Sequence, residues 1–133
     1  MKLTLFYCDK AANRSDGKLD MHGVFNELYA PGFPARQDHL VLAGVIEWSR
    51  DDEGQKPFQI EIRDPSGGNV YTIRGHTDVD ARPLTRPPAR TCLVLPLENL
   101  VFPEAGEYQT CVVVGEESLS GPSLHLMESQ GER

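Results

Sequence analysis

A histidine and two aspartates stand at alternate positions, His76, Asp78 and Asp80. An imidazole nitrogen and carboxylate oxygens are ligands that divalent cations accept in proteins. Alternate residues of an extended strand share one face but lie about 7 Å apart along it, so the trio can hold one ion only if the chain turns there. We therefore expect a solvated acidic loop, keep a divalent-metal site as the alternative, and predict no cofactor.

The residue types of a general base occur together at Asp38-His39, where a carboxylate could orient an imidazole. Neighbouring residues of a strand point to opposite faces, so we expect an exposed loop rather than a catalytic dyad. The sequence has no Gly-x-Ser-x-Gly turn, and Ser66-Gly67-Gly68 lacks the lysine of a phosphate loop. His22 and His125 fall within strand patterns and are expected to be structural. A small hydrolase remains an alternative, and we favour a protein that is not an enzyme.

Three arginines and three prolines occupy the nine residues from Arg82 to Arg90, in a chain whose acidic residues outnumber its basic ones by 20 to 13. Prolines favour an extended segment that loses little entropy when it docks. The segment predicts either a docking loop for an acidic partner or a rigid connection between strands. Phe33, in the proline-rich turn Ala30–Pro34, is the other candidate contact, although we expect its ring to be buried. The protein-interaction candidates are therefore Phe33, Arg82, Arg86 and Arg90.

The strands that carry these residues are predicted from the alternation of apolar and polar side chains at every second position. Phe58–Arg63 alternates apolar and polar side chains, Asp64–Asn69 collects turn formers, and Asn69–Arg74 returns as a second strand, which together predict a hairpin. The same reasoning predicts further strands over Leu3–Cys8, Lys18–Tyr29 with a bulge at Gly23, His39–Ser49 covered on both faces, Thr91–Leu97, Glu107–Val114 and Ser123–Met127.

No segment shows a convincing apolar stripe at helical spacing. The pattern favours an all-β fold, an antiparallel β-sandwich of the immunoglobulin-like Greek-key type with about seven or eight strands, with a small β-barrel as the alternative. Pro103-x-x-Gly106-x-Tyr108 predicts a tyrosine corner, in which the hydroxyl bonds to nearby backbone. We expect one domain over residues 1–127 and a flexible polar tail over residues 128–133.

The net charge of −7 on 133 residues argues against binding to nucleic acid or to an anionic membrane surface. No apolar run approaches the roughly 20 residues that span a bilayer, and the apolar run near the N-terminus is too short for a secretory signal. These features predict a cytoplasmic protein. The three cysteines, Cys8, Cys92 and Cys111, are then expected to be reduced, with a Cys92–Cys111 disulfide between neighbouring strands as the alternative.

Four turn and packing motifs occur together: Cys8-Asp9, Gly17-Lys18-Leu19 followed by Gly23, Tyr29–Pro34, and Phe102–Tyr108. With them the chain resembles, from Leu3 to about Met127, a family of small bacterial proteins known only as a domain of unknown function. The resemblance implies an immunoglobulin-like, cytoplasmic, all-β domain, and it carries over no catalytic residue.

We therefore expect a non-enzymatic module for protein–protein interaction, an accessory part of a larger bacterial assembly. Self-association is also expected, because open sandwiches carry edge strands that can pair. The alternatives are a sandwich that binds a small ligand or a divalent metal, and a small hydrolase.

Overall fold

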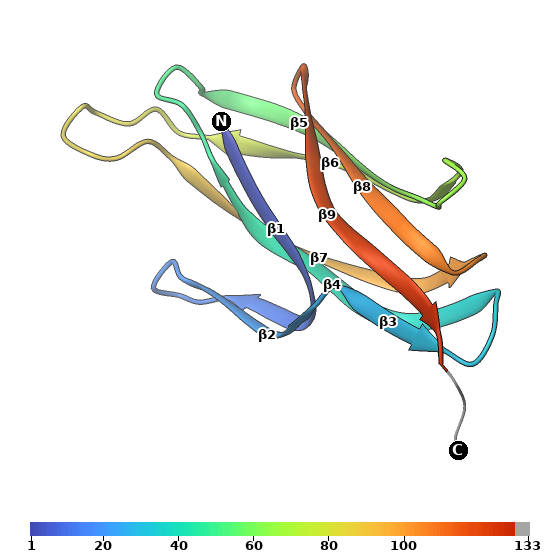
Figure 1. Cartoon of the computed structure of the whole chain (residues 1–133). Coiled ribbons are helices and arrows are strands. Elements are labelled where there is room, and N and C mark those ends of the chain that lie inside the picture. Colours follow the sequence, from blue (N-terminus) through green and yellow to red (C-terminus); the bar gives the residue numbers. More distant parts are fainter. Residues whose placement is uncertain (130–133) are drawn as a thin grey trace.

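The computed structural model describes residues 1–129, which form nine β-strands in two packed sheets (Figure 1). The strands, in chain order, are β1 Lys2–Asn13, β2 Leu19–Phe25, β3 Glu27–Ala30, β4 Ala35–Glu47, β5 Gly54–Arg63, β6 Asn69–Val79, β7 Arg90–Phe102, β8 Gly106–Val114 and β9 Glu117–Glu128. One sheet has four strands in the order β2-β1-β4-β7, and the other has five in the order β3-β9-β8-β5-β6. All neighbours are antiparallel except β3 and β9, which are parallel.

Two separate sheets confirm the predicted all-β sandwich and exclude the barrel, and the strand count is nine rather than seven or eight. The predicted hairpin is present as β5 and β6, paired from Gly54↔Val79 to Arg63↔Asn69. Its turn is held by Asp64, whose carboxylate accepts hydrogen bonds from the backbone N–H of Ser66 and Gly68. No helix capable of crossing a membrane occurs between residues 1 and 129.

The predicted single strand Lys18–Tyr29 is wrong, because the chain changes sheets at Asn26. β2 pairs with β1 in the four-stranded sheet, whereas β3 pairs with β9 in the five-stranded sheet. The predicted bulge at Gly23 is also absent, since the register between β1 and β2 is the same on both sides of it. Gly23 instead has φ +68°, and a Cβ there would collide with the carboxylate of Asp9.

Side chains of the β1–β2 hairpin cover part of the outer face of the four-stranded sheet to which the hairpin itself belongs. Its Ala11 and Met21 pack on a small cluster formed by Cys8, Val41 and Ala43, all of them buried. The opposite face of β4 contributes buried residues such as Leu42 to the core between the sheets. This arrangement confirms that the apolar run beginning at His39 is covered on both sides, although the strand itself spans Ala35–Glu47.

The main core lies between the two sheets and contains two buried tyrosines. Tyr7 lies with its hydroxyl 2.5 Å from Thr110 Oγ1, and burial raises its pKa to about 12 despite that hydrogen bond. Tyr108 donates its hydroxyl proton to the carbonyl of Glu104 at 2.7 Å and accepts from the N–H of the same residue at 3.1 Å. These two bonds confirm the tyrosine corner, and the ring packs edge-on against Phe102.

The disulfide alternative is wrong, because Cys92 and Cys111 are not bonded to each other, and their strands β7 and β8 are not neighbours. All three cysteines are free. At the other end of the chain, Glu128 is the last residue of β9, and the N–H of Ser129 donates to the carbonyl of Ala30 at 2.8 Å. Residues 130–133 of the predicted tail lie outside the described residues.

Candidate functional site

The segment from Asp80 to Arg90, which we call the arginine–proline loop, joins β6 of one sheet to β7 of the other and extends from one end of the sandwich (Figure 1, yellow). Leu84 lies in this loop with 85% of its surface exposed. The backbone N–H of Arg86 donates to the carbonyl of Pro83 at 3.0 Å and closes a turn around Leu84. An apolar side chain is thus held in solvent by an ordered turn.

Two arginine side chains donate hydrogen bonds to backbone carbonyl groups of the loop. Arg82 Nη1 donates to the carbonyl of Pro87 across the base of the turn, and Arg50 Nη1, from the β4–β5 connection, donates to the carbonyl of Pro83, each at 3.4 Å. Such bonds restrict the loop before any partner arrives, which reduces the entropy lost on docking.

The arginine–proline loop is a cationic region of an acidic protein. None of Arg50, Arg82, Arg86 and Arg90 forms an ion pair with a carboxylate of the described residues 1–129. Asp80 is the one acidic residue within the loop sequence. The guanidinium groups therefore keep most of their charge available to an incoming carboxylate, the group that arginine binds with the best geometry.

The histidine and two aspartates considered as metal ligands are not brought together. β6 stays paired with β5 until Val79, so His76 and Asp78 are spaced along an extended strand, with Asp80 just beyond it. All three are exposed, and no group of three His, Cys, Asp or Glu side chains between residues 1 and 129 could hold a metal ion. The acidic loop expected here is therefore wrong, because β6 extends to Val79, and the turn that a metal site requires does not occur there.

Asp38 and His39 do not face one another either. His39 Nδ1 lies 2.6 Å from Glu98 Oε2 on β7, and Asp38 lies 3.7 Å from Arg36. Both pairs are exposed, but the loop expected here is wrong, because Asp38 and His39 lie within β4. Phe33 packs against the main core but is only half-buried, so the burial expected for its ring is confirmed only in part.

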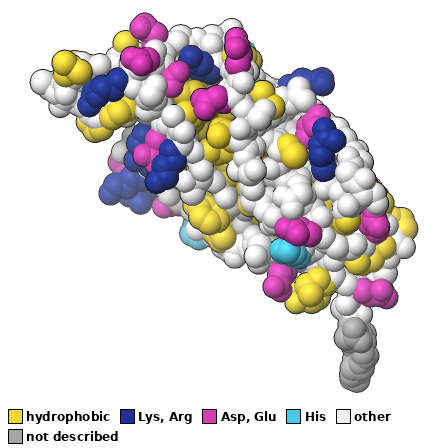
Figure 2. All heavy atoms as spheres, turned by 45° about the horizontal axis from the view of Figure 1, so that its top comes forward, with side chains coloured by type: hydrophobic (Ala, Val, Ile, Leu, Met, Phe, Trp, Pro, Cys, Tyr) yellow, Lys and Arg dark blue, Asp and Glu magenta, His cyan; other side chains and the backbone are white. Residues whose placement is uncertain are grey.

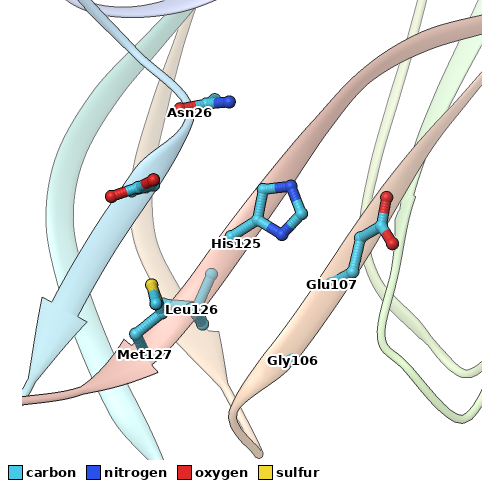
Figure 3. Close-up of a pocket in the computed structure, with 7 residues that line it drawn as sticks. Asn26, Gly106, Glu107, His125, Leu126 and Met127 are labelled. Carbon is cyan, nitrogen blue, oxygen red and sulfur yellow. The ribbon is translucent and has the colours of Figure 1, made fainter.

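A pocket of about 370 Å³ lies at the end of the sandwich where β3, β8 and β9 meet (Figure 3). We call it the Glu–His pocket, and its lining residues are Asn26, Glu27, Gly106, Glu107, His125, Leu126 and Met127. His125 is the central residue, because it pairs with Glu27 on β3 and with Glu107 on β8. Figure 3 shows its ring between Asn26 and Glu107.

The Glu–His pocket is acidic with an apolar rim. Glu27 accepts a hydrogen bond from the hydroxyl of Tyr29 at 2.9 Å, which raises the pKa of that phenol, and Glu107 accepts one from Gln109 at 3.0 Å. Neither carboxylate has a Lys, Arg or His ion-pair partner among residues 1–129. Tyr29 and Met127, which pair across β3 and β9, are 60% and 41% exposed.

The sequence does not predict this pocket. Its pattern indicates a structural role for His125, and the two glutamates belong to strands far apart in the chain. Their approach depends on β3 joining the five-stranded sheet, and the continuous strand pattern through Asn26 carries no sign of that change. The available signal is the alternation within β8 and β9, which places Glu107 and His125 on the face opposite their buried neighbours Tyr108 and Leu124.

No protein of curated function matches the chain. The family resemblance inferred from the turn motifs is confirmed by a family model that matches residues 3–127, nearly the whole sequence. The chain accordingly belongs to DUF6941, a family of unknown function.

Proposed function

We propose that this protein is a non-enzymatic protein-binding module, whose arginine–proline loop docks on an acidic partner. The observation that carries the proposal is Leu84, 85% exposed within a hydrogen-bonded turn and accompanied by arginines that have no carboxylate partners within residues 1–129. Interfaces derive most of their binding energy from a few anchors of this kind, in which a side chain fills a pocket and arginines pair with charges around it.

The positive charge adds specificity and speed rather than a large share of affinity. Guanidinium groups attract an acidic surface during encounter and repel a basic one. The tyrosine corner at Tyr108 supports an immunoglobulin-like version of the sandwich, a scaffold that presents loops at its two ends. Three free cysteines fit a reducing compartment such as the bacterial cytoplasm, where the module would serve as an accessory part of a larger assembly.

A synthetic peptide with glutamates on both sides of a leucine tests the proposal, with the same peptide carrying lysines in place of the glutamates as its control. Fluorescence anisotropy should show binding of the acidic peptide alone. Leu84→Asp should weaken it at least about tenfold, which corresponds to the loss of one anchor. Lys18→Glu, which also replaces an exposed residue of a turn with an acidic one, should leave binding unchanged.

Equal binding of the two peptides would show that charge does not select the partner. Equal binding by the protein and its Leu84→Asp variant would show that the loop is not the docking surface. Photo-crosslinking from position 85 in the native cell then identifies the partner, and a crosslinked protein counts only if Leu84→Asp abolishes its capture.

A further inference from the structure

We infer that the partner of the arginine–proline loop is a second copy of this chain, with Leu84 of one copy seated in the Glu–His pocket of the next. The inference rests on the proposed function, because it assigns an occupant to the same loop. The inference makes the loop and the pocket the two sides of one interface, and it predicts how the copies are arranged.

Charge complementarity is the first support. The loop presents Arg82 and Arg86 without carboxylate partners, and the pocket presents Glu27 and Glu107 without cationic ones, in both cases among residues 1–129. In Figure 2 a histidine near the C-terminal end is bordered by acidic side chains, with no basic side chain beside it. Arginine binds carboxylates in a two-pronged geometry, so each surface offers what the other lacks.

Apolar complementarity is the second support. Leu84 needs an apolar cover, and the pocket is an open depression with a volume of about 370 Å³. Met127 lines the pocket with 41% of its surface exposed, and Leu126, which also lines it, is buried in the main core. A leucine side chain therefore fits the cavity and would bury both its own surface and that of Met127.

The arrangement of the two surfaces requires two molecules. The loop extends from the end of the sandwich where β6 finishes, whereas the pocket lies at the opposite end, where β3 and β9 finish (Figure 1). The loop cannot reach the pocket of its own chain. Each copy then uses a different surface for each of its two neighbours, a head-to-tail contact that builds rings or open chains rather than a symmetric dimer.

A pair of complementary variants tests the inference. The loop variant carries Leu84→Asp and Arg86→Glu and keeps its pocket, while the pocket variant carries Glu27→Lys and Glu107→Lys and keeps its loop. Sedimentation velocity over a concentration series should show oligomers for the unchanged protein and monomers for each variant alone. An equimolar mixture of the two variants should associate, because the unaltered basic loop of the pocket variant meets the unaltered acidic pocket of the loop variant.

Charge reversal on both sides restores the contact. A chain that keeps Leu84 and carries the four substitutions Arg82→Glu, Arg86→Glu, Glu27→Lys and Glu107→Lys pairs an acidic loop with a basic pocket, so it should associate more strongly than either variant alone. Added salt should weaken the oligomers of the unchanged protein, because exposed charges are screened. Glu116→Lys, which reverses a glutamate in the exposed β8–β9 turn, is the control and should associate like the unchanged protein. Circular dichroism of every variant verifies that it remains folded.

An unchanged protein that stays monomeric at every concentration overturns the inference, as does a folded four-substitution chain that associates no better than the single-surface variants. Oligomers that persist in the pocket variant also overturn it. A monomeric protein that still binds the acidic peptide through Leu84 would reject self-docking and leave the proposed function intact. If the peptide is not bound either, both are rejected.

Discussion

Raising the pH from 10 to 12 should cost the folded protein about 2 kcal/mol through the phenol of Tyr7 alone. Burial raises the pKa of Tyr7 from 10.0 to about 12, so over this range the unfolded chain has lost a proton that the folded chain still holds. Stability therefore falls as the pH rises through the interval, by about 1.4 kcal/mol per pH unit in its middle and by less near each pKa, where one of the two states is half ionised. Well below pH 10 both states are protonated and the contribution is fully present.

Urea unfolding of the protein and of Tyr7→Phe, measured between pH 8 and pH 12, gives the comparison. At neutral pH the substitution should be destabilising by about 1–3 kcal/mol, because Thr110, 2% exposed, loses the partner of its hydroxyl. The deficit should shrink with rising pH, since phenylalanine has no proton to lose. Tyr29→Phe removes an exposed phenol and should keep the alkaline loss of the unchanged protein. A Tyr7→Phe protein that loses the same stability over the interval as the unchanged one would refute the reasoning.

Two further experiments test the fold, a glycine substitution and a thiol modification. Gly23→Ala should destabilise the protein by about 1–3 kcal/mol in urea unfolding, because φ +68° is strained for alanine and its Cβ meets Asp9. Asp9→Ala in the same chain should recover the part due to the collision, and no recovery would mean that the strain is conformational alone. A thiol reagent should modify exposed Cys111 in the native protein but reach Cys8 only after unfolding, because burial encloses that thiol and raises its pKa. Rapid modification of Cys8 under native conditions would show that the β1–β2 hairpin opens.

Local patterns predict the parts of the fold that depend on neighbouring residues. The β5–β6 hairpin follows from alternation and turn formers, and the bonds of Tyr108 follow from the spacing of a proline, a glycine and a tyrosine. The change of sheet at Asn26 cannot be predicted in this way. It depends on pairing between β3 and β9, which are separated by five strands in the chain, and no local preference encodes a partner at that distance.

The same distinction separates the two halves of the proposed interface. The composition of Arg82–Arg90 is enough to distinguish that segment from the rest of an acidic chain. The exposure of Leu84 cannot be predicted, because a single leucine between prolines suits a buried anchor as well as a free one. The Glu–His pocket depends entirely on which strands become neighbours, since its residues come from both ends of the chain.

The parallel pairing of β3 with β9 has a consequence for biosynthesis. β3 leaves the ribosome before the five strands β4 to β8, and the partner that supplies its backbone hydrogen bonds is made only after them. Until then its edge and the exposed ring of Tyr29 remain available to chaperones or to nascent neighbours. Closure of the sandwich at this corner is therefore a late event, and substitutions in β9 should retard maturation of a segment translated long before it.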